Sequence, residues 1–157
     1  MRQPCGCQAS RSPRRRRSAE HVMSELAPIL AVAAVCVRDG RLLLVKRGRG
    51  AAVGRWAVPG GKVEFGESLA TAVRRELREE TGLEGVVGPL CGIAERHAGD
   101  RHYVILDFWV EVPSGSPVAA DDAAGVRWAG RQELERLPVV PLLREFLAQH
   151  GVLSQLR

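Results

Sequence analysis

Residues 61–83 read GKVEFGESLATAVRRELREETGL, and this stretch decides the fold. Residues 68–81 form the one long helical pattern in the first two-thirds of the chain. Ser68 or Glu67 can cap the start of this helix, and Gly82 suits the left-handed position that follows a helix C-terminus. The sequence therefore predicts a loop, a helix and a second loop in succession.

Three glutamates, Glu76, Glu79 and Glu80, lie on adjoining positions of the predicted helix. The apolar stripe of the same helix consists of Leu69, Val73 and Leu77. Because Glu76 and Glu80 project within or beside that stripe, their carboxylates face inward or into a cleft, where unpaired negative charges repel. A cation must neutralise them, and oxygen ligands without His or Cys suit Mg²⁺, or Mn²⁺ as a substitute, better than zinc.

The glycines before the helix complement these acids. Pro59-Gly60-Gly61 lets the backbone approach a ligand closely, because glycine has no Cβ to clash. The Gly61 carbonyl can supply a further metal ligand. Arg75 lies four residues before Glu79, so the two side chains can pair and fix the rotamer of the acid.

The order of the remaining elements indicates an α/β fold. Asp39-Gly40 between two apolar runs predicts a hairpin, because a type I′ turn needs positive φ at both central positions. The expected strands are residues 29–37, 42–46, 56–59, 86–95, 102–112 and 126–128, and the later helices are residues 132–137 and 142–150. Strands before, between and after helices predict an α/β/α sandwich with a mixed β-sheet.

The segment at residues 61–83 resembles the Nudix box, G-x5-E-x7-R-E-U-x-E-E-x-G-U with U aliphatic, at every fixed position. The resemblance extends over about residues 29–150 and includes the hairpin, Trp56 and Val126-Arg127-Trp128. It implies a Nudix-type α/β/α sandwich with a loop–helix–loop metal site. Glu76, Glu79 and Glu80, with Gly61, would bind Mg²⁺, and Glu67 would support the site.

The resemblance also implies hydrolysis by in-line attack of water on phosphorus. The water needs a base. Glu79 or Glu80 can serve, and relatives often use an acid from the loop ahead of the late Trp-bearing strand. That loop offers Asp121 and Asp122, of which we favour Asp122, although an acid in a turn can also serve only the turn.

Substrate contacts are expected from four residues outside the box: Arg47, Trp56, His102 and Tyr103. Arg47 ends a strand beside a Gly-rich loop and can hold phosphate, as can Arg49 and Arg55. His102 and Tyr103 begin a strand where they can contact base or ribose. The alternatives are solvated loop arginines and a strand histidine with a structural role.

The net charge of +5 is confined to the N-terminus. Residues 1–22 hold six arginines and one acid, which leaves 17 basic and 17 acidic residues in the rest of the 157-residue chain. We expect a disordered Arg-rich extension over residues 1–24, one Nudix domain over 25–152 and a C-terminal tail over 153–157. The neutral domain removes nucleic acid as the default partner. The apolar run at residues 29–37 is far short of the ~20 residues that span a bilayer, so we expect a cytoplasmic protein without a membrane partner.

The box indicates the chemistry but does not specify the substrate. Residues 102–108 and 120–123 resemble short bacterial ADP-ribose pyrophosphatases, which implies hydrolysis of ADP-ribose to AMP and ribose 5-phosphate. One alternative is a MutT-like pyrophosphatase of 8-oxo-dGTP or another non-standard nucleoside triphosphate. Another is a nucleotide-sensing module that binds without cleaving, although such modules commonly lose box acids. Relatives are often homodimers, so a homodimer is possible here.

Overall fold

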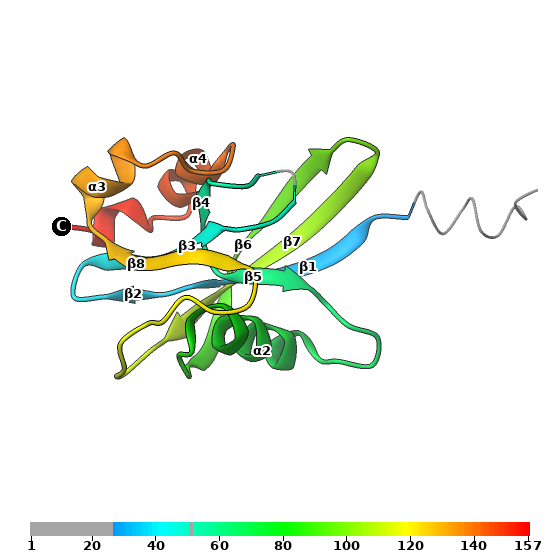
Figure 1. Cartoon of the computed structure of the whole chain (residues 1–157), viewed down its shortest axis with the longest axis horizontal. Coiled ribbons are helices and arrows are strands. Elements are labelled where there is room, and N and C mark those ends of the chain that lie inside the picture. Colours follow the sequence, from blue (N-terminus) through cyan, green and yellow to red (C-terminus); the bar gives the residue numbers. More distant parts are fainter. Residues whose placement is uncertain (1–26, 51) are drawn as a thin grey trace, which may run out of the picture.

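The computed structural model describes residues 27–50 and 52–157. Two β-sheets lie between helix α2 on one side and helices α3 and α4 on the other (Figure 1). This arrangement confirms the predicted α/β/α class. The predicted Arg-rich extension over residues 1–24 and the first residues of the predicted domain lie outside the described residues.

The first sheet contains β1 (Ile29–Val35), β5 (Gly60–Lys62), β6 (Val86–Ala98) and β7 (Arg101–Glu111), in the order β5-β1-β7-β6. β1 runs parallel to β7 and antiparallel to β5, whereas β6 and β7 form an antiparallel hairpin. The mixed character of the sheet is therefore confirmed. The short β5 places Gly60 and Gly61 directly beside strand β1.

The second sheet is antiparallel and contains β2 (Val37–Arg38), β3 (Arg41–Arg47), β4 (Trp56–Ala57) and β8 (Ala123–Ala129). The turn between β2 and β3 has φ values of 52° at Asp39 and 70° at Gly40, as the hairpin prediction requires. The single strand expected over residues 29–37 is wrong in one respect. It divides at Cys36, so that residues 29–35 join one sheet, whereas Val37 joins the other together with Arg38.

Helix α2 spans Leu69–Thr81 and has the predicted ends. The Ser68 side chain accepts a hydrogen bond from the Thr71 amide, and Gly82 is left-handed with φ 67°. The later helices are α3 (Arg131–Arg136) and α4 (Leu143–Gln149), followed by the 3-10 turn η1 (Leu153–Gln155).

The C-terminal residues belong to the fold, contrary to the expectation of a tail over residues 153–157. Leu156 is buried in the core that α3 and α4 cover. The Arg157 amide donates to the Gly40 carbonyl, and the Arg157 carbonyl accepts from the Arg131 amide. Burial of Leu156 thus anchors the chain end in the core, and the Arg157 backbone ties it to the hairpin.

Two apolar clusters hold the layers together. One packs β3 and β4 against α3, α4 and η1 around Leu44, Leu134 and Leu147. The other packs α2 against the sheets around Val32, Leu43 and Leu77, each at most 1% exposed. Within the described residues, no helix is long and apolar enough to cross a membrane.

Candidate active site

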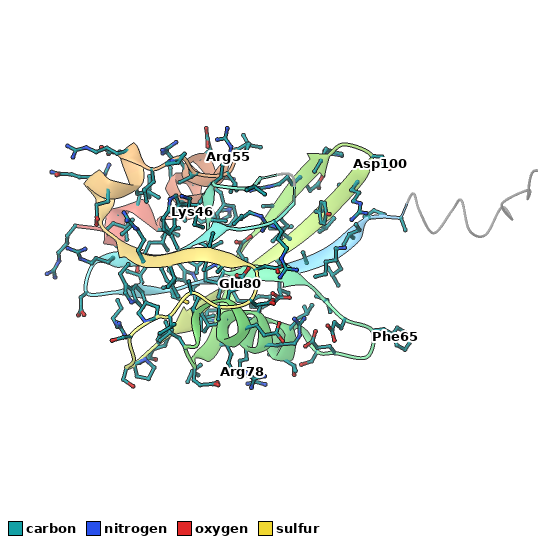
Figure 2. The ribbon with its side chains drawn as sticks, in the orientation of Figure 1. Lys46, Arg55, Phe65, Arg78, Glu80 and Asp100 are labelled. Atoms are coloured by element: carbon teal, nitrogen blue, oxygen red, sulfur yellow. The ribbon has the colours of Figure 1, made fainter. Side chains whose placement is uncertain are left out.

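Helix α2 turns one face toward the sheets and carries a glutamate on that face. Val73, Leu77 and Glu80 are buried, whereas Arg74 and Arg78 are exposed. Figure 2 shows Arg78 pointing away from the strands and Glu80 lying between the helix and the sheet. The helical wheel therefore places Glu80 correctly on the inner face.

Arg75 holds three of the box glutamates together. Its guanidinium donates to both carboxylate oxygens of Glu67 at 2.9 Å, to Glu76 at 2.7 Å and to Glu79 at 3.2 Å. It also donates to the Lys62 carbonyl at 3.0 Å, which ties the helix to β5. These acids, Glu67 first, hold the pKa of Arg75 above its usual range, and Arg75 lowers the pKa of Glu67 in return.

Gly61 lies directly against the Glu76 carboxylate. A Cβ at position 61 would overlap all three carboxylate atoms of Glu76, so this close approach requires glycine. The Glu76 side chain is 15% exposed. Burial raises its pKa, and the hydrogen bond from Arg75 opposes that shift. The predicted proximity of Gly61 to the acids is therefore present in the structure.

Glu80 is the most buried of the three helix glutamates, with 8% exposure. Its carboxylate accepts a hydrogen bond from the Gly60 amide at 3.0 Å. Burial raises the pKa of Glu80 to about 7; the Gly60 hydrogen bond opposes this, and the charges of Glu76 and Asp122 add to it. A buried acid with so few partners is typical of a functional site.

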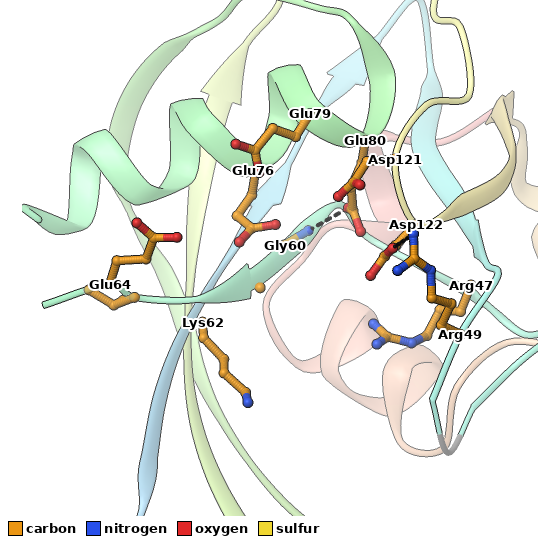
Figure 3. Close-up of a pocket in the computed structure, with 12 residues that line it drawn as sticks. Arg47, Arg49, Gly60, Lys62, Glu64, Glu76, Glu79, Glu80, Asp121 and Asp122 are labelled. Carbon is orange, nitrogen blue, oxygen red and sulfur yellow. Dashed lines mark hydrogen bonds and ion pairs between the residues drawn. The ribbon is translucent and has the colours of Figure 1, made fainter.

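The loop before β8 crosses the C-terminal end of α2 and brings two aspartates to the same place. The Ala120 amide donates to the Glu80 carbonyl at 3.3 Å, and the Asp122 carbonyl accepts from the Gly48 amide at 2.8 Å. The Asp122 carboxylate pairs with Arg49 at 2.6 Å. Both Asp121 and Asp122 therefore face the helix glutamates across a short gap (Figure 3).

These side chains surround a cavity of about 430 Å³, which we call the acidic cavity. Its charged lining residues are Arg47, Arg49, Lys62, Glu64, Glu76, Glu79, Glu80, Asp121 and Asp122, and Gly60, Gly61 and Val63 complete it (Figure 3). Lys62 and Glu64 were missed by the sequence interpretation because they occupy variable positions of the box pattern.

The donor set of the acidic cavity fits a hard divalent cation. It consists of carboxylate and carbonyl oxygens, which suits Mg²⁺ or Mn²⁺. Within residues 27–50 and 52–157, no three Asp, Glu, His or Cys side chains are already arranged to hold a metal ion. Arg75 occupies Glu76 and Glu79 instead, and it supplies the positive charge that these carboxylates need.

A second cavity of about 700 Å³, which we call the apolar cavity, adjoins the first. The two share Arg47, Gly60, Gly61 and Lys62. Tyr103, one of the predicted substrate contacts, lines the apolar cavity. Arg47 borders both cavities, and its contact with a phosphate stays a prediction.

Two predicted substrate contacts do not line either cavity, and their contact with a substrate stays a prediction. Trp56 is 8% exposed and packs in the core, where the Arg127 guanidinium covers its ring 4.9 Å from the centroid. His102 stacks on His97 at 4.4 Å and does not itself line either cavity, although it lies 3.5 Å from Glu95, which lines the apolar cavity. Arg55 also has a structural contact, because it donates to the Val139 carbonyl.

Comparison with known proteins agrees with this geometry. The NUDIX domain model matches residues 27–150. The chain belongs to this family. An ADP-ribose pyrophosphatase from Methanocaldococcus jannaschii is 36% identical over 114 residues, which cover 71% of this chain and 68% of the relative. A CTP pyrophosphohydrolase from Escherichia coli is 34% identical over 125 residues, which cover 76% of this chain and 92% of the relative.

A solved structure extends the likeness to three dimensions. The crystal structure of a MutT NUDIX hydrolase from Burkholderia pseudomallei aligns with a TM-score of 0.72 and 31% identity, over 78% of this chain and 98% of its own. The Nudix family and the complete box make this chain a hydrolase that acts on phosphorus-containing acid anhydrides.

Proposed function

We propose that this Nudix hydrolase cleaves the pyrophosphate bond of ADP-ribose and releases AMP and ribose 5-phosphate. The observation that carries the proposal is the junction of the two cavities at Arg47, Gly60, Gly61 and Lys62. A diphosphate at this junction would have acids on one side and a space large enough for a nucleoside on the other. The Methanocaldococcus jannaschii relative supports ADP-ribose as the substrate.

Glu76, Glu79 and Glu80, with the Gly61 carbonyl, would hold Mg²⁺ or, in its place, Mn²⁺. Bound Mg²⁺ would supply positive charge to the phosphate oxygens. Arg75 would orient Glu76 and Glu79, because it already contacts both carboxylates. Glu67 would support the site through its two hydrogen bonds from Arg75. Arg47 would contact phosphate from the other wall.

In the reaction, a water oxygen forms a bond to phosphorus, the bond from phosphorus to the bridging oxygen breaks, and a carboxylate takes the water proton. The candidate bases are Glu79, Glu80 and Asp122. The Glu80 pKa of about 7 suits proton transfer near neutral pH. Asp122 faces the same cavity from the opposite loop and is oriented by Arg49.

A substrate panel with Mg²⁺ tests the proposal. ADP-ribose, 8-oxo-dGTP and CTP are compared by kcat/KM, with the products identified by chromatography. We expect ADP-ribose to be the best substrate and AMP and ribose 5-phosphate to appear in equal amounts. Dominant cleavage of a triphosphate to a monophosphate and pyrophosphate would refute ADP-ribose.

Dominant cleavage of a triphosphate would instead indicate the alternative function, a MutT-like nucleoside triphosphate pyrophosphatase. It is favoured by the Escherichia coli relative, 92% of whose length aligns, and by the Burkholderia pseudomallei structure. The acidic cavity would serve both reactions equally, because both displace a group from a diphosphate. The two reactions differ in the nucleobase of the substrate and in the group at the far end of its diphosphate.

The variants Glu79→Gln and Glu80→Gln test whether the chain is a catalyst or only a nucleotide sensor. Each removes one carboxylate while keeping the side-chain shape, so Mg²⁺-dependent turnover should fall by about 100-fold or more. Glu84→Gln, on an exposed residue just past the helix, is the matched control and should keep wild-type turnover. Unchanged turnover in both box variants would exclude these residues from catalysis.

The two loop aspartates are compared directly. Asp122→Asn should lower kcat more than Asp121→Asn if Asp122 is the base, whereas KM for Mg²⁺ should change little in either variant. Asn tolerates the positive φ of 51° at position 121, so the control keeps its backbone. Equal and small effects would leave Glu79 or Glu80 as the base.

A further inference from the structure

The floor of the apolar cavity is one face of the first sheet. Asp107 on β7 pairs with Ala33 on β1 and with Gly92 on β6, and paired residues share a face. Ile105, two residues before Asp107 on β7, pairs with Ala31 on β1 and with Ala94 on β6. The His150 ring covers this face at Gly92. At Ala31, Ala33 and Ala94 the side chains are small, which leaves a hollow that Asp107 borders.

Other lining residues are mainly apolar. Val58, Val140, Leu143 and Phe146 come from the segment after β4 and from the region of α4, and the polar Glu145 and Gln149 of α4 lie among them. Arg96 on β6 lies on the same face, opposite Tyr103, and its charge acts on Asp107. The other charged residues that line the apolar cavity are Arg47, Lys62, Glu95, Asp100, Arg101 and Glu145. A flat, mainly apolar molecule with a polar edge fits such a space, and a nucleobase has this chemistry.

Asp107 is the unusual residue of this cavity. It is 4% exposed, and its Oδ2 has no hydrogen-bond partner in the described part of the chain. Burial raises its pKa to about 7, and the charge of Arg96 opposes the shift only in part. A buried carboxyl group without a partner costs free energy, so a ligand that satisfies it is a physical reason for its presence.

We propose that Asp107 is a specificity-determining residue that accepts a hydrogen bond from the exocyclic amino group of the substrate's nucleobase. A carboxylate can only accept, and among the common bases adenine, cytosine and guanine carry an amino group that donates. The inference rests on the proposed function in that the apolar cavity holds the nucleoside while the acidic cavity holds the diphosphate. It adds that the amino group, not only the ring, is recognised.

The test is a double-mutant-type cycle in which the Asp107 side chain and the amino group of the substrate are removed separately and together. ADP-ribose is compared with its analogue in which hydrogen replaces the 6-amino group, and both are assayed with wild type and Asp107→Ala. The assays run at about pH 8.5, above the pKa of Asp107, so that the carboxylate is ionised. Wild type should lose roughly tenfold or more in kcat/KM with the analogue, because the analogue leaves the buried carboxylate unpaired.

In Asp107→Ala the same loss should shrink to about threefold or less, since no carboxylate remains to be satisfied. Glu111→Ala, at an exposed acid that ends the same strand and lines neither cavity, is the matched control and should keep the wild-type discrimination. A wild-type ratio near one, which needs no variant, would overturn the proposal. So would an equal loss in wild type and Asp107→Ala.

Failure of the proposed function is distinguishable from failure of this inference. If ADP-ribose is not cleaved but a triphosphate is, the same cycle is run with ATP or CTP and the corresponding analogue that lacks the amino group. Coupling to Asp107 would then support the inference although ADP-ribose is wrong. Cleavage of ADP-ribose without coupling would support the proposed function and overturn the inference.

Discussion

Gly61→Ala places a methyl group against the carboxylate that we assign to the metal. The new carbon would lie 2.5 Å from the Glu76 carboxyl carbon and 2.6 Å from its Oε2. An ordinary contact is about 3.5 Å, so the carboxylate must move by about 1 Å. Because Arg75 holds Glu76 at 2.7 Å, that movement also disturbs the ion pair. A misplacement of about 1 Å can cost about 100-fold in rate, or about 2.7 kcal/mol of activation free energy.

The measurement is kcat/KM at saturating Mg²⁺, with a Mg²⁺ titration and a melting curve beside it. We expect the loss in rate and a weaker Mg²⁺ dependence with a small change in Tm, because the clash involves a side chain that can move. Gly125→Ala is the control, since its Cβ would meet Trp56 and Lys46 only at 3.5 and 3.6 Å. A Gly61→Ala enzyme within about threefold of wild type at every Mg²⁺ concentration would refute the reasoning.

Arg75→Gln should weaken the apparent Mg²⁺ affinity by about 10- to 100-fold, whereas Arg74→Gln, on the exposed neighbour, should not; a Mg²⁺ titration of turnover decides. In EDTA, the free energy of unfolding should fall as the pH rises from about 4 to about 7. Burial raises the pKa values of Glu80 and Asp107 to about 7. The folded protein therefore binds more protons than the unfolded chain in that pH range. Urea titrations should show a shallower fall in Asp107→Ala. Leu77→Ala should cost about 2–5 kcal/mol in the same titrations, since Leu77 is fully buried.

Local signals account for the parts of the fold that could be predicted. The helix, its Ser68 cap and the Gly82 end depend on residues within one turn of each other. The Asp39-Gly40 hairpin depends on its own φ angles. The division at Cys36 could not be predicted in this way, because it depends on pairing of β1 with β7, which lies far along the chain. The hydrophobic pattern of a strand does not specify its partner in the sheet.

The candidate site shows the same division. The three helix glutamates and Gly61 were placed correctly because their spacing on one helix and its preceding loop fixes their positions. Trp56 and His102 line neither cavity, and residue type alone does not distinguish a buried ring or a stacked histidine from a ligand contact; their role as substrate contacts stays a prediction. Asp107 was missed although it is a lone acid inside an apolar strand, a pattern that signals a buried polar group.

The two cavities differ in how the chain builds them, and this explains why the box indicates chemistry without indicating the substrate. The helix acids and Gly61 come from one continuous segment, so their arrangement survives wherever that segment folds. The apolar cavity is assembled from β1, β5, β6, β7 and α4, and each contributes only a few residues. A substitution at Asp107 can therefore change which base is accepted while the acids that would bind the metal keep their contacts. For this reason the amino-group cycle at Asp107 and the Gly61→Ala assay measure separable properties: the first should alter the ratio between two substrates, and the second should lower the rate for both alike.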